Sequence, residues 1–302
     1  MTINPRPNLF IVGAPKCGTT AWVSYLSSHP DIFFCDPKEP HFFNTDIPNF
    51  RWVRSLEEYL ELFVPAGSKK VIGEASILYL YSQEAAERMA KFNPDAKILI
   101  FVRSPERFIP SYHQQLLYNC DEDETDLARA WEMSGRRTGD TLPDGCRDPR
   151  LLDYKSIGKF GEQAARYLDC FGEGRVRIVR FEEWTANPHR TYMSLLRFLG
   201  LGDDGQTEFP RINAAHDHRS QLVARLTQRP PPFATRISRA VRTLPGLSGL
   251  QPARLLRKLN RVEGYRRGQL SPDLRAEIAA HYSEDQRHLG EIVECAGLSR
   301  AA

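Results

Sequence analysis

The chain has 302 residues, of which 41% are hydrophobic, so it is long and apolar enough to bury a core and is not an intrinsically disordered protein. Its formal net charge is +3, but the segment from Arg211 to Arg275 holds 14 basic and three acidic residues, a net charge of +11, which leaves −8 for the rest of the chain. A basic segment beside an acidic body indicates an anionic partner without identifying it.

Four short apolar runs predict buried strands, and helical patterns separate them. The strands are expected at residues 9–12, 70–72, 98–102 and 176–179, and the helices at 20–28, 82–92, 105–118 and 160–171. A shorter strand-like run covers residues 32–35. Alternation of this kind predicts an α/β fold, a doubly wound parallel sheet.

Helical patterns dominate the remainder of the chain. We expect helices at 188–199 and 272–295, two short basic amphipathic helices at 233–244 and 253–262, and a long loop at 136–150. No second domain with strands of its own is expected. The whole chain, residues 1–302, is interpreted as a single domain, with an α/β core at 8–200, a basic helical segment at 211–270 and a C-terminal helix at 271–297.

The first predicted strand leads directly into the sequence GAPKCGTT, residues 13–20, and then into a helix. Two glycines five residues apart between a strand and a helix are typical of a loop whose backbone N–H groups hold a phosphate. A nucleotide triphosphatase would carry its lysine at the end of this loop, whereas here Lys16 lies inside it and Thr19 follows the second glycine. The pattern therefore favours a phosphate ligand and argues against ordinary ATP hydrolysis.

The run PKCGTT, Pro15 to Thr20, resembles the 5′-phosphosulfate loop of sulfotransferases that use PAPS (3′-phosphoadenosine 5′-phosphosulfate). Further stretches match that family in order: PKEPHFF at 37–43, GEASILY at 73–79, VRSP at 102–105 with Ser111 and Tyr112, and VRFEEW at 179–184 with Asn187, Pro188 and FLGL at 198–201. The resemblance covers about residues 8–200 and is strongest to the carbohydrate (heparan-sulfate-like) and related bacterial branch.

The resemblance implies a set of residues that bind PAPS, without a metal ion. The backbone and hydroxyl groups of the loop would hold the 5′-phosphosulfate, Arg103 and Ser111 would hold the 3′-phosphate, and a later basic stretch would contact the nucleotide. The implied residues are Pro15, Lys16, Cys17, Gly18, Thr19, Thr20, Arg103, Ser111, Arg266, Arg267 and Gly268.

Four residues are predicted to take part in the chemistry. Lys16 would stabilise the charge that develops on the leaving phosphate, and Lys38 would lie near the transferring sulfonate or the acceptor. Position alone favours Glu74 as a structural carboxylate, but the resemblance implies that it removes the proton of the acceptor. His41, or else His113, is the candidate base if Glu74 is not, although a structural role is the simpler interpretation of each histidine.

The predicted activity is transfer of a sulfonate from PAPS to an alkyl hydroxyl of a sugar or small natural product, with release of PAP. Two alternatives remain open: a P-loop kinase or ATPase, and a nucleotide-binding regulator without catalysis. The basic segment would be a solvated surface, a lid, or a docking surface for an acidic carrier protein or an anionic membrane surface. Nucleic acid is not expected as a partner, because no nucleic-acid motif is present and aromatic residues are not interleaved with the basic ones.

Hydrophobic runs, the N-terminal residues and the cysteines also predict the cellular compartment of the protein. No apolar run approaches the roughly 20 residues that a membrane-spanning helix needs. The N-terminal residues are not typical of a secretory signal. The six cysteines are scattered and include no Cys-x-x-Cys pair, so we expect reduced thiols in a cytoplasmic protein, with neither a disulfide framework nor a zinc site.

Overall fold

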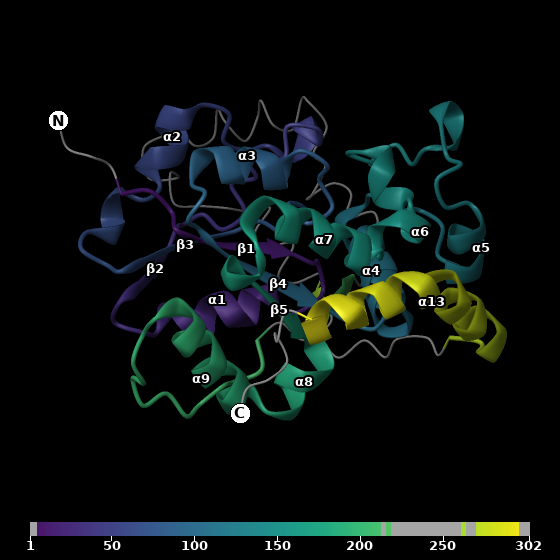
Figure 1. Ribbon diagram of the computed structural model, residues 1–302. Helices are drawn as coiled ribbons and strands as arrows, with labels where there is room; N and C mark the ends of the chain where they lie inside the picture. The colour runs from purple at the N-terminus through teal and green to yellow at the C-terminus, as the bar shows by residue number, and fades with distance from the viewer. Residues whose placement is uncertain (1–4, 213–215, 219–260, 264–269, 296–302) are drawn as a thin grey trace. The chain divides into compact units, whose positions relative to one another are not determined.

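The computed structural model describes residues 5–212, 216–218, 261–263 and 270–295 (Figure 1). The backbone divides into two compact units, which are considered one at a time. The first consists of Met1–Phe108, Ser156–Asn213 and Pro272–Ala302, and the second of Ile109–Lys155 and Ala214–Ser271. The expected core at 8–200 is thus interrupted by residues 109–155. The predicted basic helices at 233–244 and most of 253–262, and the nucleotide contacts Arg266, Arg267 and Gly268, lie outside the described residues.

The first unit is built on a parallel sheet, as the sequence predicted. Its five strands are β1 (Leu9–Gly13), β2 (Ile32–Phe34), β3 (Val71–Ala75), β4 (Lys97–Val102) and β5 (Val176–Arg180), in the order β2-β3-β1-β4-β5. All neighbouring strands run parallel. Every residue of β1 and β3 is buried, which explains the apolar runs without alternation.

Helices cover both faces of this sheet (Figure 1). Helices α1 (Thr19–Ser27) and α9 (Pro188–Leu199) lie on one face, and α3 (Ala85–Phe92) and α7 (Phe160–Phe171) on the other. Helix α13 (Pro272–Cys295) packs against α7. The doubly wound α/β prediction is therefore confirmed.

The boundaries of the predicted helices differ from the observed ones by one residue in α1 and by three residues at the start of α3. Helices α7, α9 and α13 have the predicted ends, and α1 begins one residue earlier, at Thr19. Helix α3 begins at Ala85 and not at Ser82, because the Ser82 hydroxyl accepts hydrogen bonds from the N–H groups of Glu84 and Ala85, at 3.2 and 3.1 Å. Shorter elements complete this unit: α2 (Leu56–Glu61), α8 (Phe181–Ala186), η1 (Pro48–Phe50), η2 (Val64–Ala66) and η5 (Glu173–Arg175).

Strand order determines where a ligand can bind in the first unit. The connection after β1 leads through α1 towards β2, whereas β4 is followed along the chain by β5 on the opposite side of the sheet. The winding direction therefore reverses between β1 and β4. In open α/β sheets, ligands bind beyond the carboxyl ends of the strands at such a reversal. Residues 14–18 follow β1 at this point, and Arg103 follows β4.

The second unit contains α5 (Leu127–Glu132), η3 (Gly139–Thr141) and η4 (Pro149–Leu152), while α4 (Pro105–Asn119) and α6 (Tyr154–Ile157) span the boundary between the units. The buried Glu122 accepts hydrogen bonds from Arg137 and Tyr154, at 2.5 and 2.8 Å, which balances its charge inside this unit. The predicted loop at 136–150 is a loop with two 3₁₀ turns. Pro110 lies inside α4, which nonetheless continues to Asn119.

The interpretation of the chain after the predicted strand at 176–179 as helical is wrong for two short segments. Strand β6 (His216–His218) pairs antiparallel with β7 (Arg261–Glu263) in the second unit. Two residues of the helix predicted at 253–262, Arg261 and Val262, thus lie in a strand. A local amphipathic pattern does not reveal a partner strand more than 40 residues away, and pairing with that partner satisfies the backbone groups that a helix would otherwise use.

Candidate active site

The loop after β1 is curled by residues in left-handed backbone conformations. Lys16 has a φ of 63° and Gly18 a φ of 91°. Gly18 is the N-cap of α1, and no side chain caps that helix. The positive end of the α1 dipole therefore faces the interior of the loop, the arrangement expected for binding an anion.

The side chains of the loop differ in what they can contribute. Pro15, Cys17 and Thr19 are buried, Lys16 is half-buried and Thr20 is exposed. Burial raises the pKa of the Cys17 thiol well above its usual range, and the nearby Arg103 only partly offsets this. Cys17 is therefore a neutral thiol, and what it can offer a phosphate is its backbone.

Residues beyond β4 and β5 meet this loop. Arg103 is 8% exposed, and its Nη1 donates to the Lys16 carbonyl at 3.4 Å. Its guanidinium carbon lies 4.2 Å from the ring centre of Phe181, so the ring holds the side chain in place. The Nε1 of Trp184 donates to the Cys17 carbonyl at 3.4 Å, and the indole ring lies directly against Gly18.

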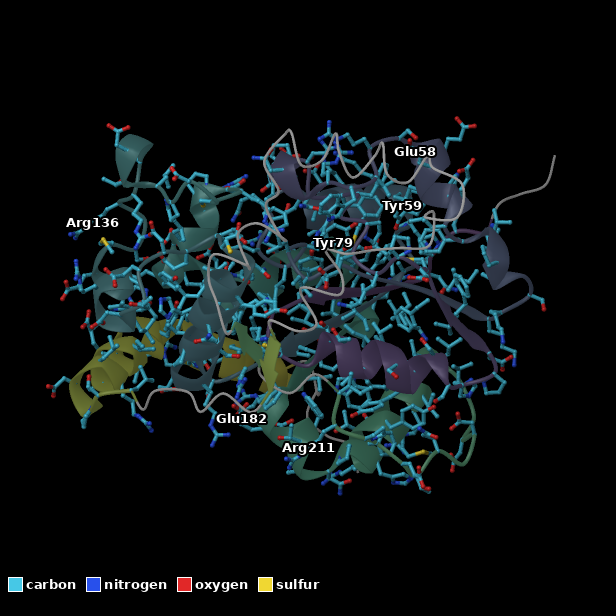
Figure 2. The ribbon with its side chains drawn as sticks, turned by 180° about the vertical axis from the view of Figure 1, so that it is seen from behind. Glu58, Tyr59, Tyr79, Arg136, Glu182 and Arg211 are labelled. Carbon is cyan, nitrogen blue, oxygen red and sulfur yellow. The ribbon has the colours of Figure 1, made fainter. Side chains whose placement is uncertain are left out.

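Glu182, labelled in Figure 2, links the turns after β4 and β5. Its Oε1 accepts hydrogen bonds from the backbone N–H and the hydroxyl of Ser104, at 3.3 and 3.0 Å. This contact fixes the start of α4 next to the position of Arg103. The motif residues after β5, Phe181, Glu182 and Trp184, therefore support Arg103, the start of α4 and the phosphate loop. This structural role accounts for them without any contact to a ligand.

Glu74 lies near the end of β3 and is completely buried. Three hydroxyl groups donate to its carboxylate. Tyr59 and Tyr79 donate to Oε2 at 2.7 and 3.1 Å, and Ser76 donates to Oε1 at 2.6 Å. Burial raises the pKa of Glu74 to about 7, and the three hydrogen bonds limit that rise because they stabilise the charged form.

The segment at 37–43 donates hydrogen bonds to two of these three hydroxyl groups, those of Ser76 and Tyr79. The backbone N–H of His41 donates to the Ser76 hydroxyl at 3.1 Å, and that of Phe42 donates to the Tyr79 hydroxyl at 2.8 Å. Each hydroxyl thus accepts from this segment while it donates to Glu74. The carboxylate consequently anchors the segment that carries Lys38 and His41.

Lys38, Glu39 and His41 lie close together within that segment. The Nζ of Lys38 lies 2.6 Å from Oε1 of Glu39, and Nε2 of the buried His41 lies 3.6 Å from Oε2. Burial alone would raise the pKa of Glu39, but the neighbouring His41 and Lys38 outweigh it and lower this pKa to about 2. Glu39 is therefore ionised at neutral pH and partly neutralises Lys38.

The predicted residues of the first unit fall into two sets. Arg103 contacts the backbone of Lys16 at the reversal between β1 and β4, and Glu74 and His41 share the Ser76 hydroxyl just after β3. Ser111 is buried in α4 but belongs to the second unit. In that unit His113 is buried, its Nε2 lies 2.8 Å from the Glu124 carbonyl, and burial lowers its pKa, all of which fits a structural role.

Tyr59 is the site residue that sequence reasoning missed. It lies in α2, for which no helix was predicted, and it is completely buried beneath the aromatic rings of Phe42 and Phe63. The Ser55 capping box marks the start of α2 and was the available signal. That signal locates the helix, but it does not indicate that the tyrosine reaches Glu74.

Two general features complete the description of the site. Among the described residues, no group of three or more His, Cys, Asp or Glu side chains could hold a metal ion. In the same part of the chain, no helix is long and apolar enough to cross a membrane.

Comparison with known proteins adds three findings. The sulfotransferase domain family matches residues 6–216. A sulfotransferase structure from Alicyclobacillus acidocaldarius is 30% identical and superposes with a TM-score of 0.62, covering 78% of this chain and 96% of that one. Carbohydrate sulfotransferase 15 of mouse is 24% identical over 248 residues, which cover 65% of this chain and 44% of that protein.

A human relative, bifunctional heparan sulfate N-deacetylase/N-sulfotransferase 2, is 27% identical over 207 residues, which cover 66% of this chain and 22% of that protein. The chain thus matches less than half the length of these curated relatives.

Proposed function

The chain belongs to the sulfotransferase domain family, and we propose that it transfers a sulfonate group from PAPS to a hydroxyl group of an acceptor, releasing PAP. One observation carries the proposal. The guanidinium of Arg103, after β4, donates to the backbone carbonyl of Lys16, after β1, and β3, which carries Glu74, is the neighbour of β1 on its other side. A phosphate cradle and a carboxylate of raised pKa on adjacent parallel strands suit group transfer from a phosphate anhydride.

The residues at the reversal between β1 and β4 would hold PAPS. The uncapped start of α1, with the backbone of residues 16–20, suits the 5′-phosphosulfate, and the guanidinium of Arg103 suits the 3′-phosphate. When bound, PAPS supplies the sulfonate, whose S–O bond to the 5′-phosphate breaks as the acceptor oxygen forms a new S–O bond. Lys16 stabilises the negative charge that develops on the phosphate oxygen. Ser111 as a second 3′-phosphate ligand remains a prediction.

Glu74 would take up the proton that the acceptor hydroxyl loses. A carboxylate with a pKa near 7 is well matched to this task at neutral pH, because it is partly ionised and sufficiently basic. Since the carboxylate is completely buried, one of its hydroxyl donors must move aside for the acceptor to reach it. Lys38 is then available to balance charge on the sulfonate, and Glu39 holds it in place.

The test combines transfer and binding. Purified protein incubated with PAPS labelled in the sulfonate is expected to transfer the label to a hydroxyl acceptor from a panel of saccharides and small alcohols. Glu74→Gln should bind PAP as wild type does and lose turnover by a factor of about 10² to 10⁴, the usual contribution of a general base.

Two outcomes would contradict the assignment of the base. If Glu74→Gln retains full turnover, His41 becomes the candidate. If PAP binding falls together with turnover, Glu74 only anchors the segment at 37–43. Failure of the wild-type protein to bind PAP or PAPS would contradict the proposed function itself.

We propose an alkyl hydroxyl on a carbohydrate or small molecule as the acceptor, on the strength of relatives named as carbohydrate and heparan sulfate sulfotransferases. An acidic carrier protein remains a candidate bearer of that acceptor.

A cytoplasmic location is also a proposal, supported by the free thiols of Cys17, Cys35, Cys120, Cys146 and Cys170.

A further inference from the structure

Tyr59 reaches the proposed base from a separate element of the fold. It lies in α2, whereas Ser76 and Tyr79 follow Glu74 directly in the chain. Its hydroxyl donates to Oε2 at 2.7 Å, and both side chains are completely buried. A hydrogen bond to a charged acceptor in a buried site is strong, and it is directional.

The ring of Tyr59 is held rigidly, so its hydroxyl has a fixed position. It stacks on Phe42 with ring centres 4.5 Å apart and an angle of 13° between the planes. Edge contacts with Phe43, Phe63 and Phe92, at 5.3, 5.1 and 5.9 Å, surround the rest of the ring. A group held in this way does not need to reorganise when the charge on Glu74 changes.

We propose that Tyr59 is a positioning residue for Glu74: its hydroxyl fixes the orientation of the carboxylate and stabilises the charged form that accepts the proton. Ser76 and Tyr79 contact the same carboxylate, but they also accept hydrogen bonds from the segment at 37–43. Tyr59 is the donor whose loss leaves those backbone contacts in place. The catalytic part of this inference rests on the proposed function.

Other ionisable groups near Glu74 also influence its pKa. They are Tyr79 on the segment after β3, Cys35 after β2, Glu39 on the segment at 37–43 and Tyr167 on α7. Glu39 is the ionised member of this set, and its negative charge adds to the rise in the pKa of Glu74. The tyrosines and the cysteine are neutral, because burial raises the pKa of each.

The variant Tyr59→Phe keeps the aromatic ring and removes the donor, and Tyr167→Phe is its matched control. The Tyr167 hydroxyl is equally buried but donates to the Tyr79 carbonyl at 2.8 Å and not to Glu74. Loss of a hydrogen bond to the charged form raises the pKa of the acid. We therefore expect the acidic limb of the kcat/KM profile to move up by about one pH unit in Tyr59→Phe, and to stay in place in Tyr167→Phe.

A second readout needs no activity. Glu74 has a folded pKa of about 7 against an ordinary value of 4.5, so its contribution to stability is complete below 4.5 and is lost as the pH rises through 7. The difference in unfolding free energy between wild type and Glu74→Gln should therefore change over this window. In a Tyr59→Phe background, the upper end of the window should move to higher pH.

The two readouts separate the two ideas. If no sulfonate transfer is found but the stability window moves, the proposed function fails and the hydrogen bond stands. If neither the window nor the acidic limb moves in Tyr59→Phe, the positioning role is overturned. Should Tyr59→Phe fail to fold, a fluorinated tyrosine at position 59, which is a stronger donor, must shift the window to lower pH, and no shift would overturn the proposal.

Discussion

Gly18 is the residue at which the backbone and the packing of the phosphate loop impose the same requirement. Its φ of 91° is unfavourable for any residue with a Cβ atom. A Cβ placed there would lie 2.4 Å from Cζ2 of Trp184, which is far inside van der Waals contact. Neither the conformation nor the indole ring therefore tolerates a side chain.

We predict that Gly18→Ala destabilises the protein by about 2–4 kcal/mol, the sum of left-handed strain and overpacking. Gly200→Ala is the matched control, because Gly200 also has a left-handed φ, of 75°, but has nothing within 4 Å of the added Cβ. It should cost only about 1–2 kcal/mol. Denaturant unfolding measures the free energy of unfolding of both variants. Equal losses of stability would mean that the Trp184 ring moves aside without an energetic cost.

Individual residues of the site were predictable to different degrees. Lys16, Glu74 and Arg103 could be proposed from the sequence because each lies next to a strand end within a recognisable motif, and their roles remain predictions. The hydrogen bonds from three hydroxyl groups to Glu74 could not be predicted as a set, because the Tyr59 hydroxyl reaches the carboxylate only through the tertiary packing of α2. Tyr59 is 15 residues from Glu74 in sequence, and an apolar helix pattern does not specify which hydroxyl finds a buried carboxylate.

Helix α7 shows how one element depends on another. Its N-cap residue, Lys159, makes no side-chain cap. Instead, Asp285 in the middle of α13 accepts hydrogen bonds from the N–H groups of Gly161 and Glu162, at 3.0 and 2.9 Å. A Cβ at Gly161 would lie 2.5 Å from the Asp285 carbonyl, so the glycine permits this close approach. The C-terminal helix therefore caps a helix of the central fold.

We predict that Asp285→Ala lowers the free energy of unfolding by about 0.5–2 kcal/mol, the usual cost of losing a cap. Glu284→Ala, at the exposed neighbouring position, should change it by less than about 0.5 kcal/mol. Thermal or denaturant unfolding of the two variants side by side tests this. Equal stability of both would show that the Asp285 contacts add nothing to the packing of α13 on α7.

Elements were predictable where local signals and tertiary packing agreed. Helices α7, α9 and α13 have the predicted ends because their apolar periodicity coincides with the face that they bury. The pair β6 and β7 was missed because its strands, three residues each, are separated by more than 40 residues. The hydrophobic periodicity of a single segment does not indicate that it pairs with a distant strand, because the pairing depends on both segments.

For the whole molecule, the charge asymmetry now has a more specific interpretation. The basic segment between Arg211 and Arg275 first indicated an anionic partner. Lys16 and Arg103, which follow β1 and β4 at the reversal of the sheet, belong to the acidic remainder of the chain. We therefore propose that the expected anion, PAPS, binds to residues of the first unit, and that the basic segment is a candidate surface for the acceptor.

Binding of PAP tests the central claim most directly, because it requires neither an acceptor nor turnover. Calorimetric titration should show that wild type binds PAP and that Lys16→Asn binds it at least about tenfold more weakly, a loss of about 1.4 kcal/mol. Asparagine removes the ammonium group yet tolerates the left-handed φ of 63° at this position. Absence of PAP binding to wild type, or equal affinity of Lys16→Asn, would contradict the account.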